Sequence, residues 1–342
     1  MKILITTRNY LPVLGGTVVY TQMFAQMFRQ LGHTVVISTR TAGEEVEGDG
    51  SLRVLRRPGY RELLRETESS DILLQVEPSI QDLIPALVSG TPVVATLHVG
   101  GSLEGLPLRG KLLRTAQRLL LPFLHPVGVS RYVLASWGSR GRSILNPYRP
   151  EIFFPPPEDL ARPIDFLFVG RITEDKGVPL LLEVLQQPAF SNCRSSIVGD
   201  GEVAEVLQTK ARQLQLSGVE FRGRLSPQEV AEEMRRSKVL IFPTLPTWLE
   251  ASPLTLIEAL ACGCQVIGSD VGGVRETGGG FIKLVPAGDA AALGEAMSEF
   301  LQNGSIDVKF EGDLKAFLKG RELKSVATEY LSYFEEVVSK SK

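Results

Sequence analysis

Cysteine is scarce in this chain of 342 residues, and histidine is equally rare. The three cysteines, Cys193, Cys262 and Cys264, cannot all pair, and their spacing does not resemble a disulfide framework. Cys262 and Cys264 lie in an apolar stretch rich in Ala and Leu, so a metal or redox pair is not favoured. We expect packed, reduced thiols.

Long apolar runs and a large excess of charge are also missing. No segment approaches the roughly 18 apolar residues of a membrane span, and the apolar start of the chain becomes polar at Thr6, too early for a signal peptide. The net charge of −2 and pI of about 6.1 argue against a dedicated nucleic-acid-binding protein, which would carry a basic stripe. We expect a cytoplasmic protein, with peripheral contact to the inner face of a membrane left open.

Short apolar runs do alternate with longer helical stretches, a pattern typical of parallel α/β architecture. A Pro-rich stretch at 147–157 interrupts this alternation, which then restarts. Strands are predicted at 3–6, 35–38, 72–76, 93–97, 127–129, 165–169, 195–198, 239–242 and 265–267. Helices are predicted at about 18–31, 178–185 and 254–261 and over the last 20 residues.

Two such units joined by a Pro-rich connector predict two facing domains, 1–157 and 158–321. With 43% hydrophobic residues the chain can fill two cores of ordinary size. In open α/β sheets, ligands bind outside the carboxyl ends of the strands. A ligand is therefore expected at those ends, in a cleft between the domains.

Gly15 and Gly16 stand between a predicted strand and a predicted helix. Two explanations are open. Glycine lets a backbone approach a ligand at a helix N-terminus, which favours negative charge, but a turn that needs positive φ requires glycine equally well.

A second group of residues follows the strand predicted at 165–169: Gly170, Arg171 and, further on, Lys176. A guanidinium and an ammonium at the carboxyl end of a strand suit a diphosphate, because Arg offers a planar fork and Lys a point charge. The alternative is a pair of solvated loop cations.

A third group flanks the start of the helix at 254–261. Glu250 precedes that helix and Glu258 lies inside it. One carboxylate before the helix and one inside it could bind the hydroxyls of a sugar and of a ribose. The backbone amides of Leu254 and Thr255, at the helix N-terminus, could face phosphate oxygens. The alternative is a capping role for Glu250 and a solvated Glu258, which the apolar neighbours of Glu258 disfavour.

Together these segments resemble the retaining glycosyltransferases of family 4. The resemblance runs through nearly the whole chain, and it rests on the order and number of short motifs. The motifs are Gly15-Gly16, Gly32-His33, Thr96-Leu97-His98, Gly170-Arg171, Lys176-Gly177, Gly199-Asp200-Gly201, Glu250 to Glu258 and Gly272-Gly273. The chain departs from the family at Asn146-Pro147-Tyr148 and at Ala251-Ser252.

The resemblance implies a fold and a function. The fold is GT-B, an α/β fold of two facing Rossmann-like domains with a cleft between them. Domain 1–157 would bind the acceptor, 158–321 would bind the donor, and the helix at about 322–342 would return to the first domain. The reaction would transfer a sugar, with retention, from a nucleotide-diphosphate sugar to a glycan, lipid-linked or small-molecule acceptor.

The resemblance also implies roles for single residues. Arg171 and Lys176 would bind the diphosphate, Glu250 the donor sugar and Glu258 the ribose, and His98 would face the transferred sugar. No cofactor or metal is implied, which agrees with the lack of an Asp-x-Asp motif. The implied catalytic residues are His98, Arg171, Lys176 and Glu250, and the implied donor-binding set adds Gly15, Gly16, Gly170, Gly199, Arg224, Leu225, Leu254, Thr255 and Glu258.

One basic segment lies outside these motifs. Residues 1–158 carry 17 Lys and Arg against 13 Asp and Glu, and the cations include Arg109, Lys111, Arg114 and Arg118 within an apolar stretch. A basic amphipathic helix can lie on an anionic membrane surface. The alternative is an ordinary helix with a solvated basic face.

Other functions compete with this interpretation. Gly199-Asp200-Gly201, with Ala204 and then Glu220, fits a dinucleotide fingerprint after a strand, which would indicate an NAD(P)-dependent oxidoreductase. It would leave Arg171, Lys176 and the two glutamates without a role. Another GT-B enzyme, such as a sugar-nucleotide epimerase, or a GT-B protein that binds without turnover, is also open.

Overall fold

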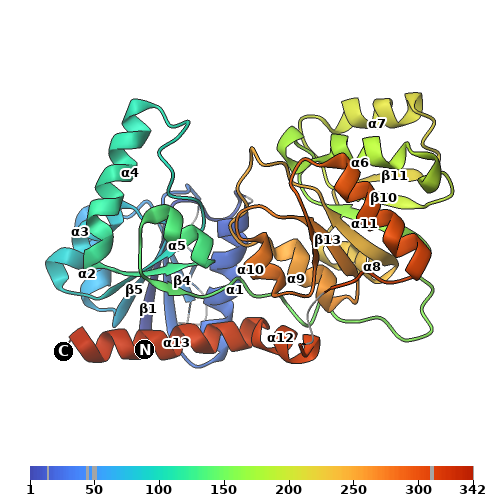
Figure 1. Ribbon diagram of the computed structural model, residues 1–342. Coiled ribbons are helices and arrows are strands. Elements are labelled where there is room, and N and C mark those ends of the chain that lie inside the picture. Colours follow the sequence, from blue (N-terminus) through green and yellow to red (C-terminus); the bar gives the residue numbers. More distant parts are fainter. Residues whose placement is uncertain (14, 44–45, 48–51, 309–311, 342) are drawn as a thin grey trace. The chain divides into compact units, whose positions relative to one another are not determined.

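Two compact units make up the part of the chain that the computed structural model describes, namely residues 1–13, 15–43, 46–47, 52–308 and 312–341. Unit 1 contains Met1–Leu145 and Leu323–Lys342, and unit 2 contains Asn146–Glu322 (Figure 1). The division falls before the Pro-rich stretch, whereas the sequence placed it after that stretch. Tyr148 and Phe153 are buried in a core of unit 2, so the stretch packs into that unit and the prediction of a connector was wrong.

Unit 1 is built on an eight-stranded sheet in the order β3-β4-β2-β1-β5-β6-β7-β8, in which only β3 is antiparallel to its neighbour. Without the edge strands β3 and β8, this is the order of a doubly wound dinucleotide-binding sheet, and the strand order reverses between β1 and β5. Its strands are Lys2–Thr7 (β1), Thr34–Thr39 (β2), Val46–Glu47 (β3), Leu52–Arg56 (β4), Ile72–Val76 (β5), Val93–Leu97 (β6), His125–Gly128 (β7) and Arg142–Ser143 (β8). Its helices are Gly16–Gln30 (α1), Tyr60–Glu68 (α2), Ile80–Ser89 (α3), Leu108–Leu120 (α4), a 3-10 turn at Leu121–Phe123, Arg131–Trp137 (α5) and Leu323–Ser341 (α13).

The last helix belongs to the core of unit 1. Apolar residues recur along α13 at helical spacing and form a stripe on one face. That stripe packs on α1, where the rings of Phe24 and Tyr330 lie 5.1 Å apart and those of Phe28 and Phe334 5.7 Å apart (Figure 1). Aromatic burial of this kind ties the two ends of the chain to one sheet.

Unit 2 contains a parallel sheet in the order β11-β10-β9-β12-β13-β14, again that of a Rossmann sheet, with the reversal between β9 and β12. The helices predicted at 178–185 and 254–261 have those bounds. The strands are Ile164–Val169 (β9), Ser195–Val198 (β10), Val219–Gly223 (β11), Ser237–Phe242 (β12), Gln265–Ser269 (β13) and Lys283–Val285 (β14). The helices are Val178–Leu185 (α6), Ala204–Gln213 (α7), Pro227–Arg235 (α8), Leu254–Ala261 (α9), Val274–Gly278 (α10), Ala290–Asn303 (α11) and Leu314–Gly320 (α12), with 3-10 turns at Glu174–Lys176 and Pro188–Phe190.

The central strands of unit 2, β9, β10, β12 and β13, are largely buried on both faces, as is typical of parallel sheets. Successive side chains point to opposite faces: Phe166 and Phe168 enter the core under α6 and α11, and Leu167 enters the core under α8 and α9. All three cysteines are buried and free, which confirms the expectation of packed, reduced thiols. Burial raises the pKa of Cys262 and of Cys264 to about 12.

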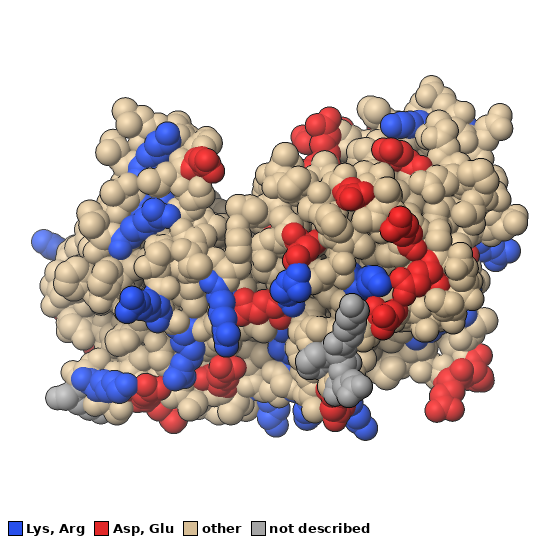
Figure 2. Space-filling model, viewed as in Figure 1, with Lys and Arg blue, Asp and Glu red and all other residues tan. Residues whose placement is uncertain are grey.

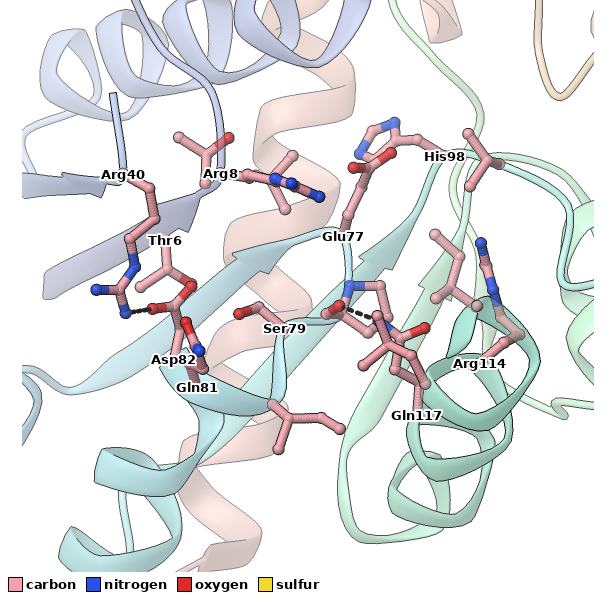
Figure 3. A pocket seen from close by; sticks show the side chains of 18 of the residues that line it. Thr6, Arg8, Arg40, Glu77, Ser79, Gln81, Asp82, His98, Arg114 and Gln117 are labelled. Carbon is pink, nitrogen blue, oxygen red and sulfur yellow. Dashed lines mark hydrogen bonds and ion pairs between the residues drawn. The ribbon is translucent and has the colours of Figure 1, made fainter. Parts of the chain in front are cut away.

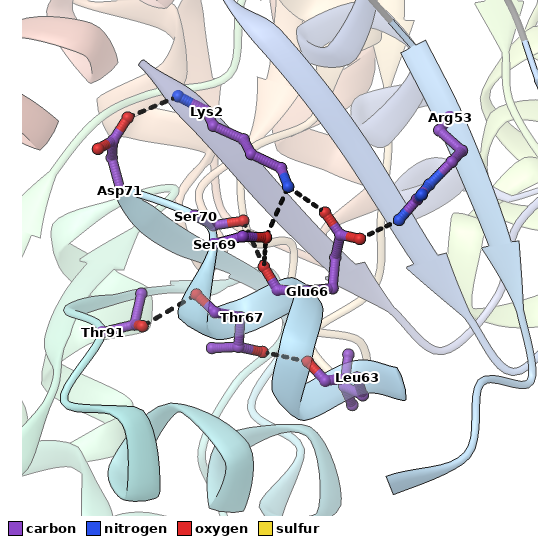
Figure 4. Close-up of polar contacts among 9 residues, drawn as sticks. All are labelled: Lys2, Arg53, Leu63, Glu66, Thr67, Ser69, Ser70, Asp71 and Thr91. Carbon is purple, nitrogen blue, oxygen red and sulfur yellow. Dashed lines mark hydrogen bonds and ion pairs between the residues drawn. The ribbon is translucent and has the colours of Figure 1, made fainter. Parts of the chain in front are cut away.

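A polar cluster joins the amino ends of the unit 1 strands (Figure 4). Glu66 of α2 is buried and forms ion pairs with Lys2, at 2.6 Å, and with Arg53. The backbone N–H of Lys2 donates to Asp71 Oδ2 at 2.7 Å, which ties β1 to the start of β5. The cluster therefore neutralises its own charges and lies at the edge of the sheet away from the carboxyl ends of the strands.

Candidate functional site

The residues predicted to bind the donor follow the carboxyl ends of the unit 2 strands. β9 and β12 are neighbours at the reversal of strand order, and loops that leave a sheet at such a point diverge and open a crevice. The topology thus brings to one edge of the sheet residues from four separate loops: Gly170 and Arg171 after β9, Gly199 after β10, Arg224 and Leu225 after β11, and Glu250 after β12.

An ion pair joins Lys176 to Glu250, residues that lie 74 positions apart in the sequence. Thr244 Oγ1 donates to the same carboxylate oxygen, Glu250 Oε1, at 3.1 Å. The Lys176 and Glu250 side chains are only 13% and 10% exposed. Charges withdrawn from water need partners, so in the protein without ligand each of these two groups neutralises the other. Two of the predicted catalytic side chains are therefore in direct contact.

Trp248 belongs to the same group of residues, although the sequence analysis did not single it out. Its ring lies 5.4 Å from Lys176 Nζ and 5.7 Å from Arg171 Cζ. The face of an indole ring attracts cations, so Trp248, which lies in the loop between β12 and α9, helps to hold the two positive groups that follow β9. A tryptophan in the short segment before Glu250 was the signal available in the sequence.

The N-terminus of α9 completes this edge of unit 2. Pro253 is the N-cap residue, and no side chain caps the helix. The first amides of α9, at Leu254 and Thr255, therefore have no intrahelical partner and favour an anion. Further along α9, burial raises the pKa of the Glu258 carboxyl to about 7, against the lowering effect of Arg149. In its ionised form this carboxyl group can accept hydrogen bonds from hydroxyls.

The packing of unit 2 by itself explains why Gly199 and Gly201, of the dinucleotide-like motif, are glycines. Gly199 has φ +137°, and an added Cβ there would lie 1.8 Å from the carbonyl oxygen of Gly170. At Gly201 a Cβ would lie 2.2 Å from the carbonyl oxygen of Ile172. The close packing of these two loops requires glycine at both positions without any dinucleotide. In the oxidoreductase alternative Glu220 would bind the ribose of the dinucleotide. Its side chain is exposed and pairs with Arg222.

In unit 1, Gly15 and Gly16 lie at the start of α1, and one of the two explanations for them was wrong. Gly15 has φ 170°, which is extended backbone that any residue can adopt, and neither glycine lies in the left-handed region that favours glycine. The explanation by a strained turn therefore fails. A Cβ added at either position would meet no described atom within 4 Å, so the packing of unit 1 does not require glycine there.

His98 follows β6 and is held on two sides. Its Nε2 lies 3.0 Å from Thr96 Oγ1, and its ring meets the ring of Tyr20 edge to face at 4.4 Å. Burial lowers the pKa of His98 to about 4, so the imidazole is neutral at pH 7. A neutral, fixed imidazole can donate a hydrogen bond to a sugar hydroxyl or accept one from it.

A cavity of about 800 Å³ opens at the carboxyl ends of the unit 1 strands (Figure 3). Arg8 after β1, Glu77 after β5 and His98 after β6 line it, together with Arg114 from α4. The sequence analysis missed Arg8 and Glu77. The available signal was their position, because each comes directly after a buried strand.

Helix α4 packs few of its apolar side chains. None of its residues is buried, and Leu108, Leu112 and Leu119 are 74%, 64% and 70% exposed. Lys and Arg side chains lie along this helix in Figure 2. Arg118 turns back and donates to the carbonyl oxygens of Gly101 and Ser136, and the Arg114 guanidinium lies 4.4 Å from the centre of the Trp137 ring. Of the four predicted surface cations, Arg109 and Lys111 remain exposed.

A search for helices that could cross a bilayer found none among the described residues.

Comparison with known proteins finds relatives among glycosyltransferases. Residues 150–313 match the family model of glycosyl transferases group 1. A phosphatidyl-myo-inositol mannosyltransferase of Mycobacterium leprae is 28% identical over 287 residues, which cover 79% of this chain and 74% of that protein. A putative colanic acid biosynthesis glycosyltransferase, WcaL of Salmonella typhimurium, is 31% identical over 146 residues, only 36% of its own length.

Solved structures agree on the fold. Anabaena HepE in complex with UDP has a TM-score of 0.78 and 16% identity, and the match covers 98% of this chain and 100% of that one. WaaG, a glycosyltransferase involved in lipopolysaccharide biosynthesis, has a TM-score of 0.70 and 15% identity over 97% of this chain and 99% of that one. These likenesses confirm an α/β fold of two Rossmann-like domains. Residues 150–313 therefore match the glycosyl transferases group 1, and the whole chain has the fold of solved glycosyltransferases such as WaaG, as the resemblance in the sequence implied.

Proposed function

We propose that this protein is a retaining glycosyltransferase that takes a sugar from a nucleotide-diphosphate sugar bound at the carboxyl edge of the unit 2 sheet. The observation that carries the proposal is the pairing of Lys176 with Glu250 beside Arg171 and the uncapped N-terminus of α9. That edge offers cations and amides for a diphosphate and carboxylates for hydroxyls. The UDP in HepE gives the nucleotide precedent.

The ion pair suggests how donor binding prepares the site. A diphosphate carries more negative charge than the Glu250 carboxylate and competes with it for the Lys176 ammonium. Glu250 then becomes available to accept hydrogen bonds from the donor sugar. Arg171 and Lys176 stabilise the negative charge that develops on the leaving diphosphate. Stabilisation of developing charge is usually the largest single contribution to lowering an activation barrier.

The finer features of the reaction belong to the same proposal. Two cations beside the diphosphate can supply the charge stabilisation that a metal supplies elsewhere, so we propose a metal-independent reaction. Retention is proposed from the family resemblance. The coupling constant of the product's anomeric proton, measured by NMR, checks it, and an inverted product would refute retention while leaving sugar transfer intact.

The test of the proposed function is thermal unfolding of the full chain with UDP, GDP, ADP and NADH in parallel. A ligand at about 100 times its dissociation constant adds roughly 2.7 kcal/mol of stability. We expect one nucleoside diphosphate to raise the Tm and NADH to leave it unchanged. A shift with NADH alone would overturn the proposal in favour of an oxidoreductase, and no shift with any nucleotide would reject donor binding.

Donor binding should depend on pH through Glu258. Its pKa is about 7 in the free protein, and ribose hydroxyls donate to the ionised carboxylate, so binding favours loss of the proton. The ionised fraction rises about tenfold between about pH 6 and pH 8. We therefore expect the affinity for the nucleotide to rise by up to about tenfold over that range.

Isothermal titration calorimetry of the wild type and of Glu258→Gln checks this dependence. The phosphate groups of the nucleotide also titrate near pH 6, but they do so equally in both proteins. The difference between the two slopes therefore reports Glu258 alone. Equal slopes would show that Glu258 does not contact the ribose in its ionised form.

A further inference from the structure

The cavity of unit 1 lies where the strand order of the unit 1 sheet reverses. β1 and β5 are neighbours there and run parallel. Arg8 follows β1 and Glu77 follows β5, and in Figure 3 their side chains point toward one another at the centre of the pocket. Crevices at this position in open α/β sheets are ligand sites. At about 800 Å³, the cavity has the size of a small-molecule site.

Glu77 occupies this position at a conformational cost. Its φ is +66°, although it is not a glycine. The left-handed region costs a non-glycine residue roughly 1–2 kcal/mol, and such strain gathers at functional sites. The Glu77 backbone N–H donates to the Thr96 carbonyl at 3.1 Å, which fixes this turn. The Glu77 side chain forms no hydrogen bond or ion pair with the other described residues.

The pocket carries more positive than negative charge. Four arginines and two carboxylates line it, and one pair, Arg40 with Asp82, neutralises itself at 2.5 Å. Arg8, Arg109 and Arg114 then face Glu77 alone. Arg8 forms no side-chain hydrogen bond with the rest of the described chain, and Arg114 makes one long bond of 3.3 Å to the Gly100 carbonyl oxygen. The remaining charge calls for an anionic occupant.

One wall of the pocket is also the exposed helix α4. Leu113 and Gly110 of α4 line the cavity together with Leu106, which precedes the helix. On the same helix, Leu108 and Leu112 are 74% and 64% exposed, beside the cations Arg109 and Lys111. An anionic group that enters this pocket therefore does so next to an apolar and basic surface, which is the combination that favours a lipid interface.

We infer, on the basis of the proposed function, that this pocket binds the sugar acceptor and that the acceptor carries a phosphate group. Arg8 and Arg114 hold the phosphate, and Glu77 accepts a hydrogen bond from an acceptor hydroxyl. Guanidinium groups bind phosphate oxygens through paired, charge-assisted hydrogen bonds. A neutral glycan would leave Arg8, Arg109 and Arg114 with Glu77 as their one facing carboxylate among the described residues that line the pocket.

Glycerol 3-phosphate and glycerol are the soluble probes, since they differ only in the phosphate. We expect the wild type to bind glycerol 3-phosphate at least about tenfold more tightly than glycerol in calorimetry. Arg8→Gln should remove that preference, and Arg8→Lys should restore part of it. Arg61→Gln, the same change of charge on the exposed face of α2, is the matched control and should retain it. Thermal unfolding of each variant verifies that it is folded.

Vesicles of phosphatidylcholine with and without phosphatidylglycerol form the second arm, measured by co-sedimentation. Binding to phosphatidylglycerol that Arg8→Gln weakens more than Arg61→Gln indicates a lipid-borne phosphate. Dependence on Arg8 for glycerol 3-phosphate alone indicates a soluble phosphorylated acceptor. If Arg8→Gln and Arg61→Gln behave alike with both probes, the inference is wrong. The nucleotide series on the wild type reports the proposed function separately, so the two can fail independently.

Discussion

Lys176→Met is expected to lower kcat/KM by about a hundred- to a thousandfold, the loss seen when one preorganised electrostatic group is removed from a transition state. The ammonium sits beside Glu250 and under the Trp248 ring, where little water screens it. Turnover is measured as nucleotide release from the donor sugar of whichever nucleotide stabilises the protein. Lys210→Met, on an exposed position of α7 in the same unit, is the control and should leave turnover unchanged.

Stability and activity must be separated in this variant. Among the described residues, removal of Lys176 leaves the buried Glu250 carboxylate with the Thr244 hydroxyl as its one side-chain donor. A buried charge that loses its partner costs about 3–5 kcal/mol of unfolding free energy. The double variant Lys176→Met/Glu250→Gln removes the unpaired charge and should recover most of that stability. It should not recover turnover. Recovery of both would show that Lys176 serves only to neutralise Glu250, which would remove it from the catalytic mechanism.

Gly199→Ala should destabilise unit 2 by about 2–6 kcal/mol. Two effects add: the strain of a φ that side chains rarely adopt, about 1–3 kcal/mol, and overpacking against the Gly170 carbonyl oxygen, another 1–3 kcal/mol. The added Cβ would lie 1.8 Å from that oxygen, and φ is +137°. Backbone on both sides of the contact leaves no flexible side chain to move away.

Two other glycines of unit 2 serve to separate the backbone strain from the steric overlap. Gly223 has φ +67° and open space around an added Cβ, so Gly223→Ala should cost only about 1–2 kcal/mol. Gly320, at the end of α12, has neither constraint, and Gly320→Ala should be neutral or slightly stabilising. Urea unfolding of the three variants gives the comparison. If Gly199→Ala costs no more than Gly223→Ala, the close approach of the loops after β9 and β10 does not determine residue 199.

The local signals in the sequence predicted α6 and α9 with their observed bounds. Gly177 and Pro253 mark the starts of these helices, and the apolar residues behind them repeat at helical spacing. Such signals act over a few residues, because propensity, capping and periodicity are properties of neighbouring backbone. The Pro-rich stretch shows where this fails. Its composition indicated a connector, but burial of Tyr148 and Phe153 made it part of unit 2.

The residue types at the candidate site were also readable in the sequence, and their grouping into a series of motifs indicated the family. Their contacts were not readable. Lys176 meets Glu250 because β9 and β12 are adjacent in the sheet, and Arg8 shares a pocket with Glu77 because β1 lies beside β5. Strand order is decided by tertiary packing of whole elements, since the pairing partner of a parallel strand is distant in the chain. The sequence by itself therefore determined several of the helices and strands and indicated the family, and only the tertiary structure decided which charges meet.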